Sequence, residues 1–353
     1  MRRPAAAWLG ALLLLAAAAP RPAAADDTLT ELGGSIALSL GDVLDVVADR
    51  AGFYKQQHLN VVIQLVNSPS AAAALVASGK GDICGISYEA VLQGYEKGLH
   101  LQYFFTKAAR LSNVLAVLDD SPIRSLNDFK GKNIGVFNIG SAGEITAQLI
   151  LAGAGLRKDD VTFSPIGAGA QALDAILNHR VDAIAYPYAE IVPMELRAHF
   201  QMRVWRHPTL QDVPAAAYAS TPDTLASKAD AIRRFARATA EAALFVKTNP
   251  VAAARMFLAA SHAPFTDADV ALRARSFVLL RPDLPDVDPR TGEIGALSEP
   301  LMQRYAQALA DYGMTKTVVP VDQVITNRFI DAANDFDHRA VIALAENWPR
   351  STR

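Results

Sequence analysis

Short apolar runs alternate with amphipathic stretches from Ser35 onward, with the lengths typical of strands and helices. Gly52 and Gly79 close two of the helical stretches, and Ser68 followed by Pro69 is a typical helix start. The pattern predicts three strands and two intervening helices, at 35–40, 60–66 and 82–87, and at 42–57 and 68–79. Nearly continuous apolar strands separated by helices indicate a mainly parallel sheet covered on both faces, so the predicted class is α/β.

The same order of elements restarts about one hundred residues later. Asp82 in "GKGDICGIS" and Asp182 in "NHRVDAIAY" each stand between a helix end and an apolar strand, 100 positions apart. The second pattern predicts three strands and two helices, at 133–139, 160–166 and 181–187, and at 141–155 and 168–179. A repeat of this size predicts two lobes of similar architecture.

The chain after Ala215 has mostly helical spacing. One long helix is predicted over 223–249, a second begins at Asn249-Pro250, and a third begins at Thr266 with Asp269 in a capping-box arrangement. The Pro- and Asp-rich segment 281–295 is predicted to be a loop. Helices of this kind usually cover an existing sheet, so we expect the chain to return to the first lobe after building the second.

The first 25 residues have the pattern of a cleavable export signal. Two arginines precede the apolar run Trp8 to Ala19, and Ala23-Ala24-Ala25 offers a small-residue cleavage site near Ala25. A membrane anchor is the alternative, but Pro20 and Pro22 interrupt a run that is already short for a bilayer. We therefore expect an exported protein.

Charge and cysteine content narrow the function classes. Removing the signal with its three arginines changes the formal net charge from −2 to −5, and no Lys/Arg block marks a nucleic-acid surface, so nucleic acid is not an expected partner. Cys84 is the only cysteine, which excludes an intramolecular disulfide, and it lies far from the cleavage site where a lipid-bearing cysteine would stand. Its apolar neighbours favour a buried small side chain over a nucleophile.

Candidate binding residues follow the predicted strands, because ligands of open parallel sheets lie beyond the carboxyl ends of the strands. Free amides at the helix starts that follow these strands favour anionic groups. Tyrosine rings also suit a pocket for a small molecule. The candidates are Leu40, Gly41, Asp42, Ser68, Ser70, Ser87 and Tyr88 in the first lobe, and Asn138, Gly140, Ser141, Tyr186 and Tyr188 in the second.

Structural roles compete with binding at several of these positions. Ser141 forms a capping box with Glu144, so it either contacts the ligand or only caps its helix. The tyrosines either contact the ligand or form a partly buried rim. Asp82 and Asp182 stand at the amino ends of their strands, opposite the ligand edge, and we expect them to serve in turns or caps.

The sequence leaves the sign of the ligand's charge open and offers no sign of catalysis. Lys107 and Arg110 lie near the expected cleft, but so do Asp42, Glu89 and Glu190. The seven histidines form no metal-binding spacing, and no nucleophile elbow or P-loop is present. "GAGAQA" at 167–172 is only a partial dinucleotide pattern. We therefore expect no enzyme activity, no metal and no cofactor.

Four segments in order resemble one family, the solute-binding proteins of nitrate/taurine/sulfonate-type ABC importers. The segments are "VVADRAGFYKQQHLNVVIQLV", "SPSAAAALVASGKGDICGIS", "DDSPIRSLNDFKGKNIGVFNIGSAGE" and "AQALDAILNHRVDAIAYPYAE". "SPIRSLNDFKGKNIGV" is similar to the place where that family's chain enters its second lobe. The resemblance covers about Ser35 to Val204 well and the helical remainder loosely.

The resemblance implies the type II periplasmic binding protein fold, with a solute held between two lobes. Lobe 1 would comprise 26–116 and 217–353 and lobe 2 would comprise 117–216, with crossovers near 114–120 and 214–221. The family's binding positions map onto Leu40 to Asp42, Ser68 to Ser70, Ser87-Tyr88, Asn138 to Ser141 and Tyr186 to Tyr188. Tyr186-Pro187 departs from the tryptophan-like or small residue that is commoner in the family, so the solute stays open.

The implied function is capture of a small polar organic solute, such as a sulfonate, nitrate or an aromatic carboxylate. The implied partners are that solute and an ABC permease of the inner membrane with its ATPase, and the protein would be a monomer. Two alternatives stay open at this point. One is a protein that makes or binds the thiamine-pyrimidine precursor, and the other is a sensory ligand-binding protein.

Overall fold

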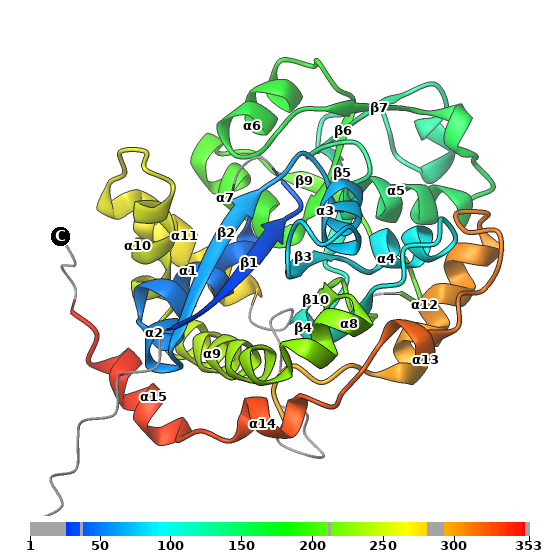
Figure 1. The fold of residues 1–353 in the computed structure, drawn as a ribbon. Helices are drawn as coiled ribbons and strands as arrows, with labels where there is room; N and C mark the ends of the chain where they lie inside the picture. Colours follow the sequence, from blue (N-terminus) through cyan, green and yellow to red (C-terminus); the bar gives the residue numbers. More distant parts are fainter. Residues whose placement is uncertain (1–25, 36–37, 211–212, 281–292, 350–353) are drawn as a thin grey trace, which may run out of the picture.

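A computed structural model describes residues 26–35, 38–210, 213–280 and 293–349. The predicted export signal and most of the predicted loop 281–295 lie outside the described residues. Within them, no helix combines the length and the apolar character that crossing a membrane requires. The chain forms two five-stranded sheets with helices packed around each, as the repeat predicted (Figure 1).

The first sheet has the strand order β2-β1-β3-β10-β4. Its strands β1, β2 and β3 are parallel, whereas β10 runs antiparallel between β3 and β4. The strands are β1 (Asp27–Gly33), β2 (Leu59–Leu65), β3 (Ile83–Ser87), β4 (Gln102–Ala108) and β10 (Ala216–Ser220). The helical elements between them are η1 (Leu40–Asp42), α1 (Val43–Arg50), α2 (Phe53–Gln56), α3 (Pro69–Ala77) and α4 (Tyr88–Tyr95).

The predicted first strand at 35–40 is wrong. The first strand of the sheet is instead β1, at Asp27–Gly33. Leu40 already belongs to the helical turn η1, where the backbone N–H and the hydroxyl of Ser39 both donate to Asp42 Oδ2. The error arises from Glu31, which is 1% exposed inside β1 although a glutamate normally marks a solvent-facing position. The predicted helix 42–57 is likewise two helices, because Gly52 adopts a left-handed conformation between them.

The second sheet has the order β7-β6-β8-β5-β9, which repeats the arrangement of the first. Here β6, β7 and β8 are parallel and β5 runs antiparallel between β8 and β9. The strands are β5 (Asn113–Leu118), β6 (Asn133–Val136), β7 (Thr162–Pro165), β8 (Ala183–Pro187) and β9 (Met202–Trp205). The helical elements are η2 (Leu126–Phe129), α5 (Ala142–Ala152), η3 (Lys158–Asp160), α6 (Ala170–Leu177) and α7 (Tyr188–Ala198).

The chain crosses between the sheets twice, and both crossings are short. It leaves the first sheet after β4 and enters the second at β5, and it returns between β9 and β10. The first crossing thus precedes the predicted 114–120, because that apolar run is itself β5, paired with β8 and β9. The second predicted crossover, 214–221, likewise includes β10, which is a full strand of the first sheet.

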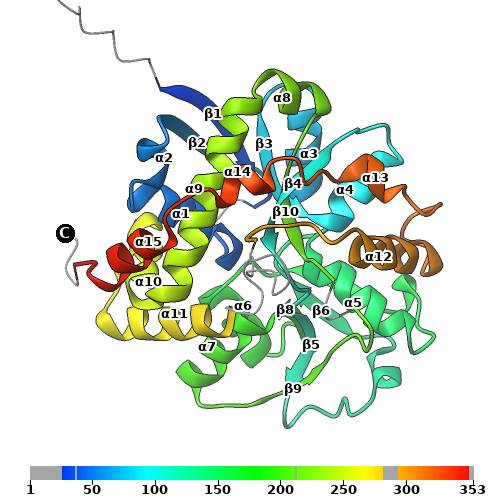
Figure 2. The same cartoon turned by 90° about the horizontal axis from the view of Figure 1, so that it is seen from below.

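The C-terminal helices pack mainly on the first lobe (Figure 2). The predicted single helix over 223–249 is divided at Lys228, which stands between α8 and α9. The long helix α9 contacts α1, α14 and α15, and its phenylalanines lie in the largest apolar core. The helices are α8 (Pro222–Ser227), α9 (Ala229–Thr248), α10 (Pro250–Ala260), α11 (Asp267–Leu280), α12 (Glu299–Asp311), α13 (Val321–Val324), α14 (Ile330–Asn334) and α15 (His338–Glu346).

Candidate functional site

A cavity of about 200 Å³ lies between the lobes and is lined by residues at the strand ends of both sheets. It has the location that open parallel sheets give to ligands. An apolar cavity of about 150 Å³ can hold a benzene ring, so this volume suits a one-ring molecule or a smaller one. Lobe 1 contributes Gly34, Ser35, Ser39, Leu40, Gly41, Asp42, Pro69, Gly85, Ile86, Ser87, Lys107 and Ala216. Lobe 2 contributes Asn113, Phe137, Asn138, Ser141, Ala142, Gly143, Ala168, Ala185, Tyr186, Pro187 and Glu190.

A buried charge network forms the lobe 1 wall. Lys107 Nζ lies 3.0 Å from Asp42 Oδ1 and 2.7 Å from Asp45 Oδ2, and the three side chains are almost fully buried. The Tyr218 hydroxyl donates to the other oxygen of Asp45 at 2.6 Å. Burial alone would lower the pKa of Lys107, but the charges of Asp45 and Asp42 raise it above its ordinary value. Lys107 is therefore a protonated counter-ion and a poor nucleophile.

Glu31 adds a third carboxyl group behind this wall. Its Oε1 accepts the Gly85 backbone N–H at 3.2 Å, and burial followed by the charge of Asp45 raises its pKa to about 8. Gly85 is needed here, because a Cβ would stand 2.7 Å from both Glu31 Oε1 and Lys107 Nζ. Burial also raises the pKa of Asp45. The cluster thus holds three carboxyl groups around one ammonium group.

Polar groups of a different kind form the lobe 2 wall. Asn138 follows β6, and its buried Oδ1 has no hydrogen-bond partner among the described residues. Ser141 caps α5 only weakly, with Oγ 3.5 Å from the Glu144 amide, and the Tyr186 hydroxyl donates to the carbonyl of Gly167. Glu190, in the first turn of α7, places a carboxylate on this wall, 3.5 Å from Arg273 of α11.

The structure brings most of the predicted site residues together at this cavity. Those that line it are Leu40, Gly41, Asp42, Ser87, Asn138, Ser141 and Tyr186. The cavity lining does not include Ser68, Ser70, Tyr88, Gly140 or Tyr188.

Local hydrogen bonds occupy Ser68 and Gly140 of the latter group, and Ser70 faces solvent. Ser68 caps α3 by accepting the Ala71 amide at 3.2 Å, and Ser70 is exposed one residue into that helix. Gly140 forms a left-handed turn, and its N–H donates to Glu144 Oε2 at 2.7 Å. The roles of Ser68 and Gly140 in this structure are therefore local.

The two predicted tyrosines that open α4 and α7 anchor their helices to the crossings. The Tyr88 N–H donates to the carbonyl of Ala215, and its ring packs edge-on against Tyr103 in the core. The Tyr188 N–H donates to the carbonyl of Ser112, and the guanidinium group of Arg206 lies over the Tyr188 ring, 4.8 Å from its centroid. Both tyrosines thus support the connections between the lobes.

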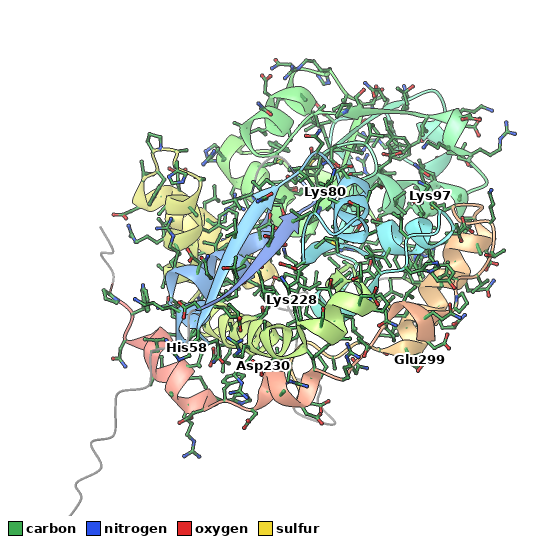
Figure 3. All side chains as sticks on the ribbon, in the orientation of Figure 1. His58, Lys80, Lys97, Lys228, Asp230 and Glu299 are labelled. Atoms are coloured by element: carbon green, nitrogen blue, oxygen red, sulfur yellow. The ribbon has the colours of Figure 1, made fainter. Side chains whose placement is uncertain are left out.

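The repeated aspartates have the structural role that the sequence predicted. Asp82 Oδ2 accepts the Thr30 amide at 2.9 Å, and Asp182 Oδ2 accepts the Asn133 amide at 2.8 Å. Each carboxylate therefore ties the start of its strand to the neighbouring parallel strand. Asp82 also pairs with Lys228, which is labelled in Figure 3 where α9 begins.

Sequence reasoning missed Glu31, Asp45 and Asn113. Asp45 lies in "VLDVV", where its neighbours are buried on every side, and a charged residue inside such a run signals a buried ion pair. Glu31 carried no comparable signal, because its strand was placed at other residues. Asn113 begins β5, which the sequence suggested was a crossover.

A second cavity, of about 240 Å³, adjoins the first at Glu190. It lies between α7 of lobe 2 and helices α10 and α11 of lobe 1, which run side by side in Figure 2. Arg197 of α7 contacts Asp269 of α11 at 2.6 Å, next to the Glu190–Arg273 pair. Two ion pairs therefore hold the lobes together beside the candidate site.

A family model described as "NMT1/THI5 like" matches residues 44–253. A putative thiamine biosynthesis protein of Haemophilus influenzae is 26% identical over 48% of this chain and 53% of its own length. A 4-amino-5-hydroxymethyl-2-methylpyrimidine phosphate synthase of Schizosaccharomyces pombe is 25% identical over 58% of this chain and 62% of its own. The chain thus spans little more than half of these two relatives. The riboflavin-binding protein RibY of Chloroflexus aurantiacus is 24% identical over 80% of this chain and 81% of its own length.

Solved structures, periplasmic binding proteins among them, share the fold. A protein of Bordetella bronchiseptica RB50 superposes with a TM-score of 0.72 at 21% identity, covering 87% of this chain and 97% of that one. The alkanesulfonate-binding protein SsuA of Xanthomonas axonopodis pv. citri, bound to MOPS, has a TM-score of 0.67 at 16% identity. The match covers 85% of this chain and 98% of that one. The periplasmic nitrate-binding protein NrtA of Synechocystis PCC 6803 has a TM-score of 0.64 at 11% identity. The match covers 91% of this chain and 89% of that one. The predicted two-lobe periplasmic binding protein fold is therefore confirmed.

Proposed function

We propose, from the premise that this chain belongs to the NMT1/THI5-like family, that it is the periplasmic solute-binding component of an ABC importer. It would capture a small polar organic solute between its lobes and deliver it to a membrane permease and its ATPase. The resemblance of the sequence to such proteins and the shared fold support this proposal.

The observation that carries the proposal is a small cavity lined by strand ends from both lobes, beside two short crossings. A solute in that position contacts both lobes at once only when they are closed. Binding therefore favours the closed form by the difference in affinity between the two forms. A membrane partner that recognises the closed form would then receive only loaded protein.

We further propose that the protein binds its solute without transforming it. Lys107 is held as a protonated counter-ion by two carboxylates. The Cys84 thiol is fully buried in β3, where burial raises its pKa. Neither group is available as a nucleophile toward a solute in the cavity.

A thermal-shift screen of the purified protein tests the proposal. The panel comprises nitrate, alkanesulfonates, aromatic carboxylates, pyrimidines and amines. A cognate solute at about 100 times its dissociation constant should stabilise the fold by about 2.7 kcal/mol. Small-angle scattering should show compaction at the same concentration. If no member of the panel raises the melting temperature, the importer function is refuted.

A matched pair of asparagine variants then tests the location of the site. Asn138→Ala removes a polar side chain from the cavity wall, whereas Asn60→Ala changes an exposed residue of β2. We expect about tenfold weaker solute binding for the first and unchanged binding for the second. Equal affinities would place the solute elsewhere.

The names of two relatives favour a second candidate function, synthesis of a thiamine-pyrimidine precursor. A cavity of this volume would also hold a single pyrimidine ring. Mass spectrometry of a solute before and after prolonged incubation separates the two functions. Unchanged solute supports binding, and a product formed in amounts above one per protein chain supports an enzyme.

A further inference from the structure

The charged side chains on the cavity wall are unequal in sign. Asp42 of lobe 1 and Glu190 of lobe 2 both line the cavity, whereas Lys107 is the only cationic side chain among the described residues that line it. Lys107 already contacts both Asp42 and Asp45 within 3.0 Å. Its charge is therefore compensated before any solute arrives. Glu190 also has a cationic partner behind the wall, because Arg273 of α11 lies 3.5 Å from its carboxylate. The excess of negative charge is therefore that of Asp42 and Asp45 over Lys107.

The groups behind the wall increase this imbalance. Glu31 and Asp45 are each 1% exposed, and the Gly85 site lets Glu31 approach the same ammonium group. When Glu31 is protonated, Asp42 and Asp45 still outnumber Lys107. Unscreened charge in a buried wall acts strongly on the adjoining space, because the effective dielectric constant is lower there than in water.

An uncharged acceptor on the same cavity points to a donor-bearing ligand. Asn138 Oδ1 is buried and has no hydrogen-bond partner among the described residues. Such an atom costs free energy unless a ligand or water donates to it.

The start of α5 lines the cavity, and a helix start is a feature that would favour an anion. That position already has a carboxylate, since Glu144 Oε2 accepts the Gly140 N–H at 2.7 Å. Lys158 lies 3.4 Å from the other Glu144 oxygen. A second anion would therefore have to compete with the Glu144 carboxylate for the Gly140 N–H.

We propose that the cleft selects solutes that carry a protonated amine, held between Asp42 and Glu190, and rejects simple anions such as nitrate and alkanesulfonates. This inference rests on the proposed function, because it takes the cavity to be the solute site. Asp42 and Glu190 come from different lobes, so one ammonium group would pair with the excess negative charge of lobe 1 and would share Glu190 with Arg273. The charge of the solute would then also favour the closed form.

Charged thiol reagents measure the potential in the cavity without knowledge of the solute. Ala216→Cys places a thiol on the wall, next to Ser87 in the register of β10 and β3, in a Cys84→Ala background. The purified protein is treated with 2-(trimethylammonium)ethyl or 2-sulfonatoethyl methanethiosulfonate, and the two rates are compared. Val251→Cys, at a position that is 53% exposed, supplies the reference ratio.

The cationic reagent should react at least about tenfold faster than the anionic one, relative to the reference position. Asp42→Asn and Glu190→Gln should each reduce that preference, and Glu190→Gln keeps the test valid if the buried variant does not fold. A ratio near one, or a ratio that neither variant changes, overturns the inference. A nitrate or alkanesulfonate that stabilises the protein would overturn it too, while supporting the importer function. A protein that no solute stabilises would refute the importer function whatever the reagent ratio.

Discussion

Replacement of Glu31 by Gln tests the buried charge cluster directly. Glu31 is 1% exposed on β1, and its Oε1 accepts the Gly85 amide at 3.2 Å. A glutamine has nearly the same volume and keeps an oxygen acceptor for that amide. The substitution therefore removes the titration of one carboxyl group with little change in packing.

The structure fixes the sign and the approximate size of the effect. Burial raises the pKa of Glu31 from 4.5 to about 8 in the folded protein. A raised pKa means that the contribution of Glu31 to stability is complete below pH 4.5 and is lost as the pH rises to about 8. Within this window the wild type should lose about 1.4 kcal/mol of unfolding free energy per pH unit relative to the variant. The accumulated difference is on the order of a few kcal/mol.

Urea unfolding at intervals from pH 5 to pH 9 checks this expectation. The two proteins should have similar unfolding free energies at pH 5, and the variant should be increasingly more stable up to pH 8. Glu346→Gln, at an exposed position in α15, is the control and should follow the wild type throughout. Parallel pH profiles for wild type and Glu31→Gln would refute the assignment of a buried, raised pKa to this residue.

Three further variants test other parts of the argument. Gly85→Ala should lower the unfolding free energy by about 1–3 kcal/mol in urea, because its Cβ would stand 2.7 Å from Glu31 Oε1 and Lys107 Nζ, and unchanged stability would contradict that close approach. Asp182→Ala should cost about 1 kcal/mol by leaving the Asn133 amide without its acceptor, whereas Asp182→Asn, which keeps an oxygen, should cost less. Arg197→Ala should change the unfolding free energy by less than about 1 kcal/mol, because both side chains of its ion pair with Asp269 are partly exposed. It should nevertheless increase the radius of gyration of the unliganded protein, because that pair joins the two lobes. An unchanged radius would show that the pair does not restrain them.

Local patterns were sufficient to predict much of the fold. The apolar runs that became β2, β3, β6 and β8 were recognised, and Ser68 with Pro69 was recognised as the start of α3. These features depend on residues within one turn or one strand of each other. The 100-residue offset between Asp82 and Asp182 likewise indicated two equivalent sheets, and both carboxylates bond the neighbouring strand in the same way.

The candidate site was predicted only in part, because several of its members depend on partners far away in the chain. Asp42 and Ser141 stand at the helix starts that follow β1 and β6, which any sheet of this order would place at the cleft. Tyr88 and Tyr188 occupy comparable positions in the sequence, yet their amides bond to the crossings and their rings turn away from the cavity lining. No local pattern distinguishes these two outcomes.

The sequence by itself determined the α/β class, the repeated unit and the return of the chain to its first lobe. Hydrophobic periodicity and capping act over a few residues, so they are legible without knowledge of the fold. The tertiary structure alone decided the charge of the cleft. Lys107 meets Asp42 and Asp45 across more than sixty residues of sequence, and Glu31 reaches the same cluster from another strand. The sign of a site is the sum over such distant charges, and only the folded chain brings them together.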